Sequence, residues 1–146
     1  MKSIPATDTR FVRKGGKVTD KLRRDLSDVL LCYSEAAAFW ADKRAKPRED
    51  YTIREAYIVG STIRGIDNSD VDLLLIPDHI EGDDYRFFKL VLAQTFFVNR
   101  PKCLAVDVFV RPHDEYPERP SFEITGQVKD ILDNYNQRLK EYPQHK

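Results

Sequence analysis

YIVGSTIRGIDNSDVDLLLIP, residues 57–77, contains two apolar runs joined by a polar loop. The first run ends at Gly60-Ser61, and the second opens with Asp70 and Asp72. Residues two apart in a strand project to the same face, so this spacing predicts that the two carboxylates share one small volume. Two carboxylates at such a short distance repel each other unless a cation lies between them, and oxygen ligands suit a hard divalent ion. The stretch therefore predicts a metal site.

Three apolar segments predict strands that are covered on both faces: 56–59, 71–76 and 104–110. Pro77 ends the second of them, and Asp107 is the single acid inside the third. A carboxylate within a buried strand is costly unless it is paired or metal-bound. We therefore expect Asp107 to be the third carboxylate of the site.

Three other segments carry apolar residues at helical spacing and predict helices: 19–43, 83–98 and 123–141. Thr19 is the expected N-cap of the first helix. The charged segment 43–50, KRAKPRED, is interpreted as a linker around Pro47, and the Pro-rich residues after Pro112 as a second connection. The order helix, strand, strand, helix, strand, helix predicts an α/β (α+β) fold with a small mixed sheet flanked by helices.

The length of 146 residues suits one domain. Residues 1–18 lack periodicity and carry four basic residues between positions 10 and 17, so we expect a flexible basic arm there, with a phosphate-binding arm as the alternative. Residues 19–146 would form the single folded domain. The 24 basic and 24 acidic residues cancel, which gives no support to bulk binding of nucleic acid or membrane.

The two cysteines, Cys32 and Cys103, lie far apart in apolar surroundings without metal-ligand spacing, so we interpret both as buried apolar residues. The N-terminus has no apolar core of signal-peptide length, and no segment approaches the roughly 18 apolar residues of a membrane span. We expect a cytoplasmic protein with no membrane partner.

One set of residues resembles the G-S-x-x-R-G and S-D-x-D-L motifs of a known family: Gly60, Ser61, Arg64, Gly65, Ser69, Asp70, Asp72 and Leu73. The pattern is similar to that of the minimal nucleotidyltransferases, the small stand-alone members of the DNA polymerase beta nucleotidyltransferase superfamily. The resemblance covers residues 56–110. It implies a polymerase beta-like nucleotidyltransferase fold and the transfer of a nucleoside monophosphate, AMP from ATP, to an acceptor hydroxyl.

The resemblance also implies roles for individual residues. The catalytic residues, which are also the ligands of Mg²⁺ (or Mn²⁺), would be Asp70, Asp72 and Asp107. The nucleotide-binding residues would be Gly60, Ser61 and Arg64. A glycine admits phosphates close to the backbone, a serine offers a hydroxyl and an N–H, and an arginine offers a bidentate fork.

Structural interpretations of the same residues stay open at this point. Gly60-Ser61 could be an ordinary turn, Arg64 a solvated loop cation, and Asp70 a cap or turn residue. Asp72 and Asp107 fit a structural role less well, because their strands contain no lysine or arginine to pair with a buried acid.

The acceptor could be a protein, an RNA end or a small molecule, and the resemblance implies a small helical protein as a partner, in the manner of an antitoxin and its toxin. Two alternatives keep the fold: a catalytically silent nucleotide-binding module and an antitoxin-type partner-binding protein. A third is a nucleic-acid-binding protein that uses the basic residues 10–17.

Overall fold

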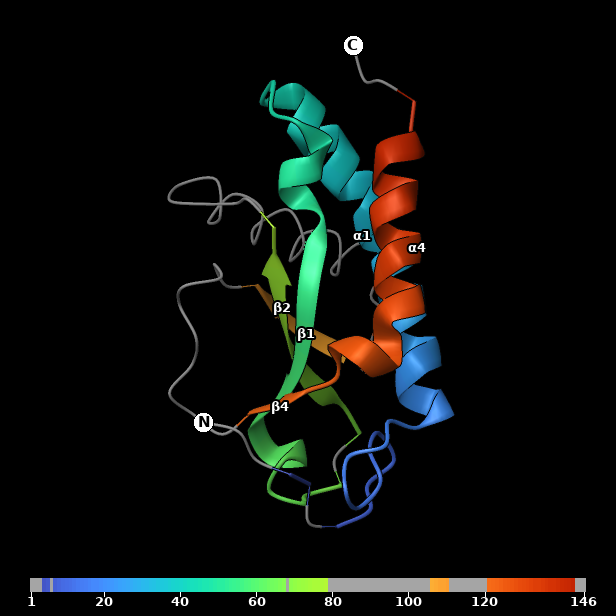
Figure 1. The fold of residues 1–146 in the computed structure, drawn as a ribbon, viewed down its shortest axis with the longest axis vertical. Coiled ribbons are helices and arrows are strands. Elements are labelled where there is room, and N and C mark those ends of the chain that lie inside the picture. The colour runs from blue at the N-terminus through green and yellow to red at the C-terminus, as the bar shows by residue number, and fades with distance from the viewer. Residues whose placement is uncertain (1–3, 6, 68, 79–105, 111–120, 144–146) are drawn as a thin grey trace.

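The computed structural model describes residues 4, 5, 7–67, 69–78, 106–110 and 121–143, with the backbone alone for 106–110. The helices and strands are α1 (Asp20–Lys43), β1 (Ile53–Val59), β2 (Val71–Pro77), β3 (Val106–Val110), β4 (Ser121–Glu123) and α4 (Lys129–Glu141). Within these described ranges, three short 3₁₀ helices accompany them: η1 (Arg48–Tyr51), η2 (Gly60–Thr62) and η3 (Thr125–Val128). The predicted mixture of helices and sheet is therefore confirmed (Figure 1).

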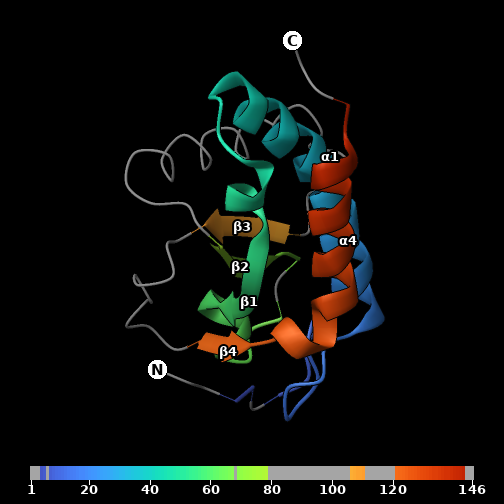
Figure 2. The same ribbon diagram turned by 45° about the horizontal axis from the view of Figure 1, so that its top comes forward.

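The four strands form one mixed sheet in the order β3-β2-β1-β4. β1 is antiparallel to both β2 and β4, whereas β2 and β3 run parallel. Helices α1 and α4 lie side by side on one face of this sheet (Figures 1 and 2). The main core lies between these helices and the sheet, and a smaller apolar cluster of Tyr57, Leu74 and Ile76 lies on the opposite face.

Helix α1 follows its prediction closely. Thr19 has extended backbone geometry, and its hydroxyl oxygen accepts a hydrogen bond from the N–H of Leu22 at 3.3 Å, as an N-cap should. The apolar residues at spacings of three and four form its buried face: Leu22, Leu26, Val29, Leu30, Tyr33 and Ala37. Among the described residues, no helix is long and apolar enough to cross a membrane.

The predicted helix over 123–141 is wrong in its first part. Residues 121–123 form β4, which pairs with Tyr57, Ile58 and Val59 of β1, and α4 starts only at Lys129. The strand satisfies the backbone groups of the β1 edge, an interaction that helical periodicity in one segment does not reveal.

Residues 7–18 are not a flexible arm. Phe11 and Val12 are fully buried and Val18 is 7% exposed, all within the main core. Val12 and Val18 form an isolated antiparallel bridge, and the side chain of Gln127 accepts from the N–H of Val18 at 2.8 Å. The core therefore includes part of this segment, although its basic residues led us to expect a solvated arm.

The interpretation of residues 43–50 as a simple linker is also corrected. Arg48 is only 6% exposed, and its guanidinium forms an ion pair with Asp42 at 2.7 Å. The predicted strands at 56–59 and 71–76 are present, and the first of them extends back to Ile53. The predictions for 83–98, for Cys103 and for the Pro-rich connection lie outside the described residues.

Candidate functional site

The segment between β1 and β2 is a tightly wound turn rather than an open loop. The N–H of Ile63 donates to the carbonyl of Gly60 at 3.2 Å, and the N–H of Arg64 donates to that of Ser61 at 3.0 Å. Thr62 and Ile63 are 1% and 6% exposed, so the buried side chains of these two residues fix the turn to the rest of the domain. Ser61 is half-buried, and Arg64 is exposed.

Gly60 lies directly against the carboxylate of Asp72. The ladder between β1 and β2 pairs Val59 with Asp72, so the residue after Val59 reaches the Asp72 side chain. A Cβ atom built on Gly60 would lie 2.6 Å from Oδ2 of Asp72. Gly60 also has a φ of +76°, a conformation that L-residues rarely adopt. The structure thus brings together one predicted phosphate-binding residue and one predicted carboxylate.

The three predicted carboxylates lie at neighbouring backbone positions. Asp70 is half-buried at a bend just before β2, so the alternation of a strand applies to Asp72 and not to Asp70. In the parallel ladder between β2 and β3, Asp72 and Asp107 are direct partners in register. The side chain of Asp107 lies outside the described part of the structure.

Carboxylate oxygens are the donors that Mg²⁺ and Mn²⁺ prefer, so the chemistry of Asp70 and Asp72 fits a hard divalent ion. Among the described side chains, no group of three His, Cys, Asp or Glu residues converges. Because the third predicted ligand, Asp107, is not among those side chains, the three-carboxylate site stays a prediction.

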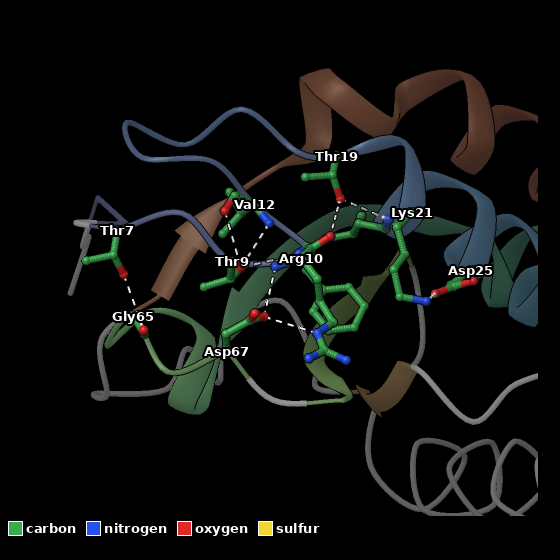
Figure 3. Close-up of polar contacts among 11 residues, drawn as sticks. Thr7, Thr9, Arg10, Val12, Thr19, Lys21, Asp25, Gly65 and Asp67 are labelled. Atoms are coloured by element: carbon green, nitrogen blue, oxygen red, sulfur yellow. Dashed lines mark hydrogen bonds and ion pairs between the residues drawn. The ribbon is translucent and has the colours of Figure 1, made fainter.

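The loop after the turn is held by the N-terminal segment, a contact that the sequence did not predict (Figure 3). The Thr7 hydroxyl donates to the carbonyl of Gly65 at 3.2 Å. Asp67 Oδ1 accepts two bonds from Arg10, from the backbone N–H at 2.9 Å and from Nε at 3.1 Å. These bonds, led by the backbone N–H, lower the pKa of Asp67.

A sequence signal for this contact did exist. Gly15-Gly16 between Val12 and Val18 is the pattern of a tight turn flanked by apolar residues, which indicates a hairpin rather than a flexible arm. An ordered hairpin would have kept the preceding residues close to the folded domain. The particular partners at Gly65 and Asp67 have no such signal.

Comparisons with known proteins give no relative: no family model, no curated protein and no solved structure matches the chain. The family resemblance of the motif residues therefore stays a prediction, to be judged by the chemistry of the site.

Replacing Gly60 by alanine should destabilise the fold by about 1–2 kcal/mol, because the new Cβ would meet the Asp72 carboxylate and the positive φ disfavours any L-residue. The free energy of unfolding in urea measures this effect. Gly126→Ala is the matched control, since a Cβ there meets nothing within 4 Å. Equal stabilities of the two variants would show that the turn does not lie against Asp72 in solution.

Proposed function

We propose that this chain is a metal-dependent nucleotidyltransferase with a polymerase beta-like fold, which transfers AMP from ATP to an acceptor hydroxyl and releases pyrophosphate. The observation that carries the proposal is the contact of Gly60 with the Asp72 carboxylate. A turn suited to phosphates and a carboxylate suited to a metal ion share one place, as nucleotidyl transfer requires. The parallel register of Asp72 with Asp107 supports the same site.

The turn would hold the triphosphate. Gly60 has no side chain, so the backbone of the turn can lie beside the Asp72 carboxylate, and Ser61 would donate its hydroxyl and backbone N–H to phosphate oxygens. Arg64, exposed one turn further on, would bind phosphate oxygens through its guanidinium fork. Together these residues would orient the nucleotide for in-line attack.

The carboxylates of Asp70, Asp72 and Asp107 would hold Mg²⁺ (or Mn²⁺). When bound, the ions neutralise charge on the triphosphate and favour deprotonation of the acceptor hydroxyl. Asp107 would be the carboxylate that takes the acceptor proton. The acceptor would be a protein, an RNA end or a small molecule, and a small helical protein partner belongs to the same proposal.

A melting experiment with ATP and Mn²⁺ tests the proposal. At a hundredfold excess over its Kd, the nucleotide should stabilise the chain by about 2.7 kcal/mol. For a chain of this size, this corresponds to a rise of roughly 5–10 °C in Tm. The rise should disappear in EDTA, because the carboxylates would hold the triphosphate only when a divalent ion is present.

An equal rise in EDTA would contradict the metal-dependent site and favour the catalytically silent nucleotide-binding module. Turnover is then tested by incubating the chain with Mg²⁺, a cell lysate and ATP labelled in its α-phosphate. Transfer of the label to an acceptor supports an adenylyltransferase. Metal-dependent binding without any labelled acceptor would again favour the silent module.

A further inference from the structure

The N-terminal segment crosses the loop that joins the Gly60-Ser61 turn to the carboxylates. Thr7 contacts the loop at Gly65, and Arg10 contacts it at Asp67 (Figure 3). Gly65 has a φ of +82°, and a Cβ there would collide with the Thr7 hydroxyl. The close approach of the two segments therefore depends on a glycine at this position of the loop.

The segment is itself fixed to the core. The Thr19 hydroxyl donates to the carbonyl of Arg10 at 2.6 Å, so the N-cap of α1 also holds this residue. Phe11 and Val12, which follow directly, are fully buried. The backbone at Arg10 is thus fixed in place, and so is the position from which Arg10 donates its hydrogen bonds to the loop.

The loop carries this restraint back to the turn. The N–H of Ile66 donates to the carbonyl of Ser61 at 3.1 Å. Asp67, the next residue, is held by both bonds from Arg10. A restraint on Asp67 therefore acts on Ser61 through a single intervening residue.

We propose that Arg10 and Asp67 are positioning residues that hold the Gly60-Ser61 turn in the conformation that binds the nucleotide phosphates. This inference rests on the proposed nucleotidyltransferase function. The side chains of Arg10 and Asp67 are 43% and 48% exposed, and exposed ion pairs contribute little to stability. Loss of the pair should therefore lower nucleotide affinity far more than the Tm of the free chain.

The test measures the Kd for ATP in Mn²⁺ by titration, together with the Tm of each variant without ligand. Asp67→Ala removes the acceptor of both bonds and should weaken ATP binding about tenfold, as for one bond to a charged group. Arg10→Met removes only the Nε bond, and Asp67→Asn keeps an oxygen for the backbone N–H. Both should therefore lose less affinity than Asp67→Ala.

Two further variants complete the design. The double variant Arg10→Met/Asp67→Ala should bind ATP no more weakly than Asp67→Ala alone, because both changes break one contact. Arg13→Met, on the same segment but without an ion pair among the described residues, is the control and should bind like the wild type.

Three other results would contradict either the positioning role of Arg10 and Asp67 or the proposed function. If Arg10→Met weakens binding while Asp67→Ala does not, Arg10 contacts the phosphates directly and the positioning role is wrong. If all variants bind like the wild type, the positioning role is wrong and the nucleotide site stands. If the wild type itself binds no ATP in Mn²⁺, the proposed function fails and this inference falls with it.

Discussion

Asp72→Asn is expected to reduce nucleotidyl transfer by roughly a thousandfold or more. Asparagine keeps the shape of the side chain and removes the charge that a divalent ion requires. Losing a residue that only supports a ligand typically costs roughly 10–100-fold in affinity or activity, and losing the ligand itself costs more. The measurement is the rate of label transfer from ATP at saturating Mg²⁺, with ATP binding measured in parallel.

Asp78→Asn is the matched control at the other end of β2. Asp78 Oδ2 accepts a hydrogen bond from the Thr52 hydroxyl at 2.6 Å, and an asparagine oxygen can accept the same bond. This variant should transfer at the wild-type rate. Activity retained by Asp72→Asn, or lost equally in both variants, would show that the carboxylate beside Gly60 is not a metal ligand.

The elements with a strong local pattern could be predicted from the sequence. Helix α1 has both a complete apolar face and a capping residue, Thr19, and its bounds agree with the prediction. Strand β2 is apolar and followed by charged residues, and it ends where Pro77 indicated. Local propensity and burial agree in these segments, so the sequence alone is sufficient.

Strand β4 and the packed segment 7–18 could not be predicted in the same way. β4 is three residues long, and its conformation depends on pairing with β1, which is more than 60 residues away in the chain. In segment 7–18, the buried Phe11 and Val12 are flanked in the sequence by basic residues, which favour the interpretation that the segment is solvated. Tertiary contacts decide both cases.

In the candidate site, too, some features follow from the local sequence and others from tertiary contacts. The family resemblance implied that Gly60 and Asp72 belong to one site, and the antiparallel ladder puts them in contact. The contacts of Arg10 with Asp67 join segments that are 57 residues apart and depend on how the loop closes. The burial of Arg48 also depends on a contact with a distant segment. This residue lies in an apparent linker and is buried by the end of a helix far away in the sequence.

Arg48 joins the end of α1 to the end of α4. Its guanidinium donates to both carboxylate oxygens of Asp42, with Nε at 3.1 Å and Nη2 at 2.7 Å. Nη1 donates to the carbonyl of Leu139 at 2.9 Å, one of the carbonyls at the C-terminus of α4 that lack a partner within the helix. The hydrogen bonds that the Arg48 guanidinium donates to Asp42 raise the pKa of Arg48, and the side chain stays charged.

Arg48→Met should therefore lower the free energy of unfolding by about 3–5 kcal/mol, since it leaves the 6% exposed Asp42 carboxylate without its buried cation. Urea unfolding measures the loss. Lys129→Met is the control, because the pair of Lys129 with Asp133 is 70% and 61% exposed and should contribute only about 0.3–0.5 kcal/mol. Arg48→Lys should lie between the two, since it keeps the charge but not the fork that reaches both helix ends. A loss no greater for Arg48→Met than for Lys129→Met would show that water reaches the Arg48 site and that the two helix ends are not joined there.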